Sequence, residues 1–254
     1  MKKSTAVRVR KIKDFGLYRE IENYITAPML GNHSSRSGRV KKTVAAVAKA
    51  NDRHTVEAVE DKIKANFHPR DWFLTLTYWD GELPNEEQRA KKDLRNFLDA
   101  IKRICTKKGI DFKWLKTTER GQRNGRLHHH LVIPGGITLE EIESKWRHGS
   151  VFPRRLWADG NNQRDGDRLN VHNLAEYFVG IHKRGKASHE RPQNKKRYSF
   201  SRNCIEPKIT YEAMSPKWLN VPRAPEGWKI APGSLCEYTD AYGLRHQRYV
   251  ILRC

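Results

Sequence analysis

Three consecutive histidines, His128, His129 and His130, are the residues of this chain whose types and spacing most clearly suggest chemistry. They lie in the run RLHHHLVI, whose apolar flanks are typical of a β-strand. Because successive side chains of a strand point to opposite faces, His128 and His130 are expected to face one way and His129 the other. Two imidazoles a short step apart on one face are a typical pair of metal ligands.

A carboxylate can join this pair from the segment just before it. The run FKWLKTTER carries Glu119 near its end, and the polar turn GQRNG separates that run from the histidines. If the two runs form a β-hairpin, Glu119 lies beside the histidines. Two imidazoles and one carboxylate would then face a single point.

The two faces of the histidine strand differ in polarity. The residues that share the face of His129 are apolar and are expected to be buried, namely Leu127, Leu131 and Ile133. The opposite face, with His128 and His130, is therefore expected to be open to solvent or ligand. The sequence predicts a divalent metal site formed by Glu119, His128 and His130, suited to Mg²⁺ or Mn²⁺, although Zn²⁺ would also bind.

A phosphodiester substrate requires a nucleophile as well as a metal ion, and Tyr177 is the leading candidate. A tyrosine can attack phosphorus and remain attached to it as a phosphotyrosine. In the run NLAEYFVGI, Tyr177 lies at helical spacing with apolar neighbours, so a buried tyrosine without a chemical role fits the spacing equally well. Basic residues follow this run, among them Lys183, whose charge could balance that of a phosphate.

The charge of the chain indicates a polyanionic partner. The 254 residues include 50 lysines and arginines against 29 aspartates and glutamates, which gives a formal net charge of +21 at pH 7. The basic residues recur along the whole chain, which favours nucleic acid as the partner over a merely well-solvated surface. The four cysteines lack the spacing of disulfide frameworks or zinc ribbons, and no apolar run is long enough to cross a bilayer. We therefore expect a cytoplasmic protein that binds nucleic acid and no membrane.

The elements that would position these residues form a mixed pattern. Alternating β-branched and aromatic residues predict a strand in DWFLTLTYW, and apolar residues at helical spacing predict helices before and after it. The expected order comprises one or two helices over residues 40–67, a strand near 71–79, a helix ending near Gly109, strands at 112–119 and 127–133, and a helix that begins at Thr138. Hairpin strands beside helices indicate an α+β fold, in which a central antiparallel sheet carries helices on one face and the metal and tyrosine residues on the other.

The two ends of the chain differ from its middle in composition. Residues 1–38 mix basic, Gly and Ser residues and have too little apolar content for a core, so we expect a flexible arm. Residues 39–212 would form the main domain together with its leading helices. Residues 213–254 form a C-terminal extension rich in Pro and Trp, in which the run RYVIL is a candidate edge strand.

Six motifs in succession carry a resemblance to a known family. They are FLTLTY, TERG, HHH, WRHGSV, AEYFVG and the basic run ending in YSFSRN before Pro207. This succession resembles the HUH endonucleases, specifically the phage and plasmid rolling-circle replication initiators known as replication-associated proteins of the ORF2 kind. The likeness covers roughly residues 60–210. It implies a ferredoxin-like or RRM-like palm, and it makes residues 39–212 the endonuclease domain.

The resemblance also implies roles for individual residues. Glu119, His128 and His130 match the metal ligands of the family, and Tyr177 matches its catalytic tyrosine. The family lysine three residues after the tyrosine falls at Gly180 here, and Lys183, one turn later, is the candidate substitute. The residues expected to track DNA are Lys195, Lys196, Arg197, Arg202 and Asn203.

The function implied is metal-dependent, site-specific nicking and rejoining of single-stranded DNA through a covalent 5′-phosphotyrosine. The expected partner is single-stranded DNA at a replication origin, with host helicase and polymerase as further candidates, in the cytoplasm of a bacterial host. Three alternatives stay open: an HUH transposase or relaxase, a metal-dependent hydrolase without a covalent intermediate, and a non-catalytic nucleic-acid-binding protein with structural histidines.

Overall fold

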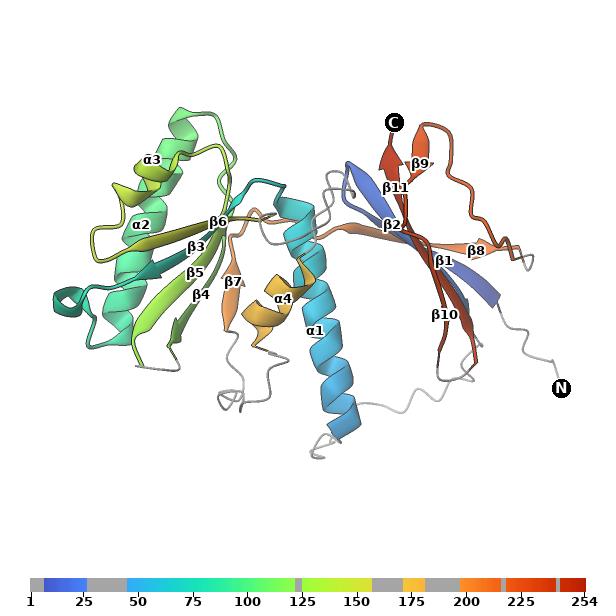
Figure 1. Ribbon diagram of the computed structural model, residues 1–254, viewed down its shortest axis with the longest axis horizontal. Coiled ribbons are helices and arrows are strands. Elements are labelled where there is room, and N and C mark those ends of the chain that lie inside the picture. Colours follow the sequence, from blue (N-terminus) through green and yellow to red (C-terminus); the bar gives the residue numbers. More distant parts are fainter. Residues whose placement is uncertain are drawn as a thin grey trace. The chain divides into compact units, whose positions relative to one another are not determined.

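The chain forms two compact units, which are seen in a computed structural model (Figure 1). The structure describes residues 7–26, 45–121, 125–156, 171–180, 197–215, 218–240 and 243–254. One unit, here the central unit, comprises Lys49–Asn161 and Leu169–Glu206. The other, here the terminal unit, comprises Met1–Ala48, Asn162–Arg168 and Pro207–Cys254, so it is assembled largely from the two ends of the chain.

The central unit is built on a five-stranded sheet in the order β6-β3-β5-β4-β7, in which every neighbouring pair is antiparallel. Its strands are β3 (Trp72–Thr77), β4 (Leu115–Arg120), β5 (Leu127–Ile133), β6 (Val151–Arg155) and β7 (Tyr198–Phe200). The strands expected near 71–79, 112–119 and 127–133 are therefore confirmed. The histidine strand β5 occupies the middle of the sheet, where neighbours on both sides fix its register.

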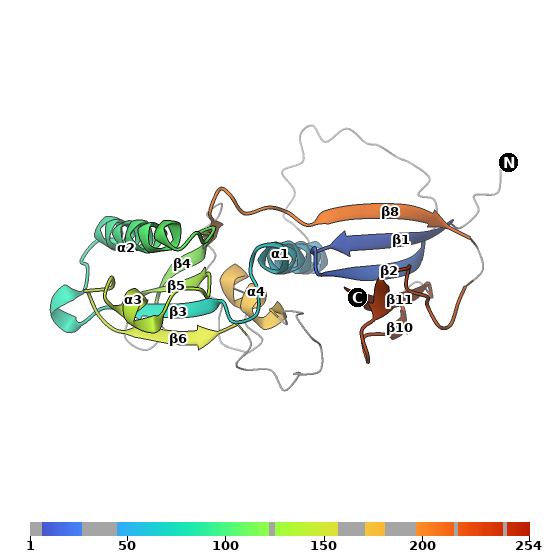
Figure 2. The ribbon, with the colours of Figure 1, turned by 90° about the horizontal axis from the view of Figure 1, so that it is seen from above.

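One face of this sheet is covered by α2 (Glu87–Lys107) and α3 (Leu139–Glu143), which follow a short 3₁₀ helix, η1 (Asp80–Glu82) (Figure 2). Apolar residues of α2 recur at helical spacing and pack on strand residues of the same face; among them are Leu94, Phe97, Leu98, Ile101, Leu74, Leu76, Leu131 and Ile133. Each side chain buried in this way contributes about 1.5–3 kcal/mol. At the start of α3, Thr138 and Glu141 form the capping box that the sequence predicts.

The other face carries a second, smaller apolar cluster beneath α1 (Ala45–Asn66) and α4 (His172–Val179). Val56, Val59, Ile63 and Phe67 of α1 pack there with Leu115, Val132 and Phe178. The α+β class with an antiparallel sheet is thus confirmed, but helices cover part of both faces. The reason is that Leu115 and Val132 make one end of the second face apolar, so it must be buried. Helix α1 is continuous through residues 51–52, where the sequence suggested a break.

The terminal unit contains a six-stranded antiparallel sheet in the order β10-β11-β2-β1-β8, with β9 also paired to β11. Its strands are β1 (Val7–Asp14), β2 (Tyr18–Thr26), β8 (Lys208–Met214), β9 (Trp228–Ile230), β10 (Cys236–Thr239) and β11 (Arg245–Arg253). Residues 7–26 therefore form a hairpin inside a sheet, which differs from the flexible arm expected for residues 1–38.

Long-range pairing explains that difference. The hairpin has little apolar surface of its own, but Ile12 and Ile21 pack against Tyr249 and Ile251 of β11, which lies more than two hundred residues later in the chain. The run RYVIL is accordingly an interior strand and not an edge strand, since β11 pairs with β2 on one side and with β9 and β10 on the other. Among the described residues, no helix combines the length and the apolar composition that crossing a bilayer requires.

Candidate metal and tyrosine site

The register of the β4–β5 pair brings the predicted ligands together. Glu119 lies directly opposite His128, and Thr117 lies opposite His130. On the other side of β5, Thr75 of β3 lies opposite His130. The hairpin inferred from the sequence is therefore present, and its two strands present Glu119, His128 and His130 on one face.

The three side chains converge within hydrogen-bonding distance. The Glu119 Oε1 atom lies 3.2 Å from His128 Nε2 and 3.2 Å from His130 Nε2. The potential ligand atoms of the three residues all lie within 4.8 Å of one another. We call this group the Glu119–His128–His130 cluster; it is a group that could hold a metal ion.

The spacing of the cluster fits a divalent cation. Ligand atoms about 2.1 Å from a metal ion are separated from each other by about 3.0–3.4 Å in octahedral or tetrahedral geometry. The two 3.2 Å separations from Glu119 Oε1 fall in this interval. Two imidazole nitrogens and one carboxylate oxygen also leave further coordination positions for a substrate or water.

The hydrogen bonds of His128 suit a ligand role. Its Nδ1 atom lies 3.2 Å from the carbonyl oxygen of Arg126, and since a carbonyl can only accept, Nδ1 carries a proton. In the neutral ring, Nε2 then presents a lone pair toward the Glu119 carboxylate. Two acceptors in contact would repel each other, so a cation must lie between them or Nε2 must be protonated. The hydrogen bond with Glu119 indeed raises the pKa of His128.

His130 is held differently. Its Nδ1 atom lies 3.0 Å from the hydroxyl oxygen of Thr75, and its ring stacks against Phe73 at 5.8 Å. Burial lowers the pKa of His130, which favours the neutral ring that coordinates metals. Thr75 is thus positioned to fix both the orientation and the tautomer of this histidine.

Glu119 is held as a carboxylate. Partial burial by itself would raise the pKa of Glu119, but hydrogen bonds from His128, His130 and Tyr177 outweigh that effect and leave its pKa well below the ordinary range. The cluster therefore keeps a negative charge at neutral pH, as a cation site requires.

His129 points to the opposite face, as the strand alternation predicts. It is fully buried, with its Nε2 atom 2.9 Å from the Tyr78 hydroxyl and its Nδ1 atom 2.8 Å from the Thr118 hydroxyl. Burial, reinforced by the charges of its neighbours, lowers the pKa of His129 to about 3. Both ring nitrogens are engaged in the core, so His129 is not a member of the metal cluster.

Tyr177 is brought to the cluster by α4. One side of its ring contacts Phe73 and Phe178 in the apolar cluster of the second face. Its hydroxyl group contacts both Glu119 Oε1 and His130 Nε2. Burial, reinforced by the Glu119 charge, raises the pKa of Tyr177, so the phenol is protonated at neutral pH. The ring is therefore part of the packing, while its hydroxyl belongs to the cluster.

The end of α4 brings one basic residue close to this site. Helix α4 ends at Gly180 with a left-handed φ of 83°, a conformation that favours glycine. A Cβ atom at this position would clash with Arg197 Nη1, so the guanidinium group packs against the end of the helix. The backbone oxygen of Arg197 also accepts a hydrogen bond of 2.7 Å from Thr117, the neighbour of His130 on β4.

The other residues expected to act on DNA have different positions. Arg202 is exposed. The Asn203 amide donates to Asp111 Oδ1 at 2.9 Å and to the Phe112 oxygen at 3.1 Å, so it also anchors the loop after α2. Lys183, Lys195 and Lys196 lie outside the described residues.

Two supporting groups were not foreseen from the sequence: the Thr75 hydroxyl and the Arg126 carbonyl, which bind the Nδ1 atoms of His130 and His128. The alternation of Thr75 with the buried Leu74 and Leu76 did place it on the ligand face. What was missing was the β3–β5 register, which a single sequence does not specify.

Comparison with known proteins adds one family. No curated protein and no solved structure matches the chain. Residues 71–181 match a family model described as replication-associated protein ORF2, and this segment runs from the start of β3 to the end of α4. It contains Glu119, His128, His130 and Tyr177. The part of the chain that carries the cluster and the tyrosine is therefore similar to the replication-associated proteins of the ORF2 family.

Proposed function

We propose that the protein is a rolling-circle replication initiator that nicks and rejoins single-stranded DNA through a covalent 5′-phosphotyrosine. The observation that carries the proposal is the convergence of the Tyr177 hydroxyl with Glu119 and His130 in one cluster. A tyrosine without a chemical role would need only one hydrogen-bond partner, and it would not need a group of potential metal ligands around its hydroxyl. The match of residues 71–181 to a family of replication-associated proteins supports the same process.

Glu119, His128 and His130 would hold a divalent cation such as Mg²⁺ or Mn²⁺. When bound, the ion would supply Lewis-acid stabilisation of the negative charge that develops on the scissile phosphate. Thr75 and the Arg126 carbonyl would keep the two imidazoles in the orientation and tautomer that leave their Nε2 atoms available.

Tyr177 would be the nucleophile. Since its pKa is raised, the phenol must give up a proton before it attacks, and the Glu119 carboxylate in contact with the hydroxyl is the candidate acceptor. The phenolic oxygen then forms a bond to phosphorus as the bond from phosphorus to the 3′ oxygen breaks. The departing 3′ oxygen takes up a proton and becomes a hydroxyl group. Attack by a 3′ hydroxyl on the phosphotyrosine reverses the step, so strands can be rejoined without a further energy source.

Basic residues around the cluster would hold the DNA strand. Arg197 packs against the end of α4, three residues after Tyr177, and is therefore the leading candidate to face the phosphate. Lys183, Lys195, Lys196, Arg202 and Asn203 are proposed as further DNA contacts. The expected setting is the cytoplasm of a bacterial host, where a free 3′ hydroxyl at the origin would prime a host polymerase, with a host helicase opening the duplex.

Covalent capture tests this mechanism. An oligonucleotide that contains the origin, labelled at its 3′ end, should give a denaturation-resistant adduct with the protein in the presence of Mn²⁺ or Mg²⁺. Tyr177→Phe should abolish the adduct and leave binding of the oligonucleotide nearly unchanged, because only the hydroxyl is lost. Tyr198→Phe, a change at a tyrosine of the same apolar cluster, is the matched control and should retain the adduct.

The same gel separates the alternatives. A cleaved product without an adduct would indicate a metal-dependent hydrolase and would refute the tyrosine mechanism. Binding without any product, whether or not EDTA is present, would indicate a nucleic-acid-binding protein with structural histidines. An adduct that persists in the Tyr177→Phe variant would assign the nucleophile to another residue.

A further inference from the structure

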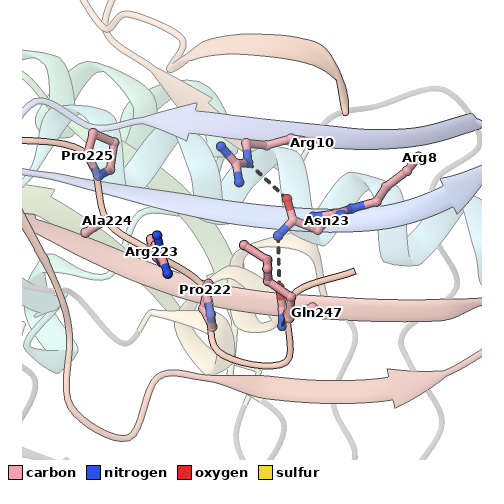
Figure 3. A pocket seen from close by; sticks show the side chains of 9 residues that line it. Arg8, Arg10, Asn23, Pro222, Arg223, Ala224, Pro225 and Gln247 are labelled. Atoms are coloured by element: carbon pink, nitrogen blue, oxygen red, sulfur yellow. Dashed lines mark hydrogen bonds between the residues drawn. The ribbon is translucent and has the colours of Figure 1, made fainter. Parts of the chain in front are cut away.

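A pocket of about 290 Å³ lies on one face of the sheet of the terminal unit (Figure 3). Its floor is formed by Arg8 and Arg10 of β1, Asn23 of β2 and Gln247 of β11. Its wall is the loop from Leu219 to Pro225, which contributes a third arginine, Arg223. We call it the arginine pocket. It lies outside the segment that matches the replication-associated family.

The polarity of the floor is not required by the packing of the sheet. Two residues further along the same strands and on the same face, Ile12, Ile21 and Tyr249 form an apolar cluster. At the next position along each strand, the side chains change to Arg10, Asn23 and Gln247. Asn23 and Gln247 are each only 1% exposed, and burying an amide is unfavourable unless it is hydrogen-bonded.

A chain of hydrogen bonds satisfies these amides and orients Arg10. Arg10 Nε donates to Asn23 Oδ1 at 3.0 Å, and Asn23 Nδ2 donates to Gln247 Oε1 at 3.0 Å, as the dashed lines of Figure 3 show. Gln247 Nε2 in turn donates to the Leu219 oxygen of the wall at 2.9 Å. The network therefore connects the floor to the loop and holds one guanidinium group in a fixed orientation, which is the arrangement of a built binding site.

Positive charge dominates the lining, since the residues that form the pocket include three arginines and no acidic residue. Arg8 is 6% exposed, and burial, with the neighbouring charge of Arg10, lowers its pKa. The Glu212 carboxylate lies 3.9 Å from Arg10, but its side chain is 51% exposed, so water screens this pair. Arg223 is exposed. An anion in the pocket would balance this charge, and planar guanidinium groups match the oxygens of a phosphate.

We propose that the arginine pocket binds a phosphodiester group of a DNA strand. The arginines would contact the phosphate oxygens, and the apolar wall at Leu219, Pro222 and Pro225 would contact the attached sugar or base. The choice of DNA as the source of the phosphate rests on the proposed function. The pocket would give the terminal unit a second hold on the strand, separate from the cluster that cuts it.

Salt-dependent binding tests the pocket on the full-length protein. A fluorescein-labelled single-stranded oligonucleotide is titrated in EDTA at increasing salt, so that cleavage does not interfere. Arg223→Ala should weaken binding on the order of tenfold. It should also reduce the slope of log K against log salt by about 0.7, the value for one lost phosphate contact on a single strand. Arg253→Ala, an exposed arginine of β11 outside the pocket, is the matched control and should behave like the unsubstituted protein.

The outcomes separate the possible failures. A slope and affinity for Arg223→Ala equal to those of the unsubstituted protein would refute the DNA assignment of the pocket. If inorganic phosphate then raises the melting temperature of the unsubstituted protein but not of Arg223→Ala, the pocket takes free phosphate instead. Absence of any DNA binding by the unsubstituted protein would remove the partner of the proposed function itself. Melting temperatures of both variants verify that they are folded.

Discussion

Replacing the buried His129 should change how the stability of the protein depends on pH. The ordinary histidine pKa of 6.5 applies to the unfolded chain, while burial lowers the pKa of His129 to about 3 in the folded protein. Below pH 6.5 the unfolded chain takes up a proton that the folded protein does not bind. The stabilisation is therefore fully present above pH 6.5 and is lost as the pH falls through 6.5 toward 3.

The magnitude follows from these two pKa values. At pH 5 the loss is about 2 kcal/mol, and below pH 3 it approaches about 5 kcal/mol. His129→Gln cannot titrate, but its amide can still hydrogen-bond Thr118 or Tyr78. Between pH 7 and pH 5, the free energy of unfolding should therefore fall by about 2 kcal/mol less in the variant than in the unsubstituted protein.

Urea denaturation of both proteins at pH 7 and pH 5, in EDTA, measures this difference. His130 and Glu119, whose pKa values are also lowered, are common to the two proteins, so their contributions cancel in the comparison. Equal pH dependence in the two proteins would refute the conclusion that His129 is buried as a neutral ring.

Three further predictions concern other parts of the molecule. Thr75→Val removes the hydroxyl that holds His130 Nδ1 and should weaken Mn²⁺ binding about tenfold by calorimetry, whereas an unchanged affinity would deny Thr75 its orienting role. Gly180→Ala places a side chain at a φ of 83° and should lower stability by about 1 kcal/mol or more in thermal unfolding; a stability gain would contradict the left-handed end of α4. Ile251→Ala should destabilise the terminal unit by about 2–5 kcal/mol and expose residues 7–26 to proteolysis, and continued protection would contradict their pairing with β11.

Much of the central unit could be predicted from the sequence because its signals are local. The strand alternation in β3 and β5, the apolar stripe of α2 and the short β4–β5 connection each lie within a few residues. The same alternation separates His129 from the other two histidines. The hairpin then brings Glu119 to the right strand without any knowledge of the rest of the fold.

The terminal unit could not be predicted in this way because its contacts are distant. Val7 and Val9 alternate with Arg8 and Arg10, and Gly16 marks a turn, so a hairpin signal is present at the start of the chain. Composition outweighed it, since a hairpin with so many charged residues has no core of its own. That core is supplied by β11, and no local pattern in residues 7–26 indicates which segment will pair with them.

The position of Tyr177 illustrates the same limit inside the site. Helical spacing placed it on an apolar stripe, which correctly indicates that its ring is packed. The spacing does not indicate that α4 lies on the ligand face of the sheet, where Phe178 packs with Val132 and Leu115. Because the ring is anchored in that cluster, the hydroxyl alone reaches Glu119 and His130.

The middle histidine has a structural consequence for the metal site. If β5 paired one residue out of register, His129 would turn to the ligand face and both His128 and His130 would enter the core. One of them could take the place of His129 beside Thr118 and Tyr78, but the other would occupy a position that Leu127 or Leu131 now fills. An imidazole buried there without hydrogen-bond partners costs about 1–3 kcal/mol, and the displaced leucine costs about as much again. The core therefore accepts a single histidine from this strand, and that restriction selects the register in which His128 and His130 both face Glu119.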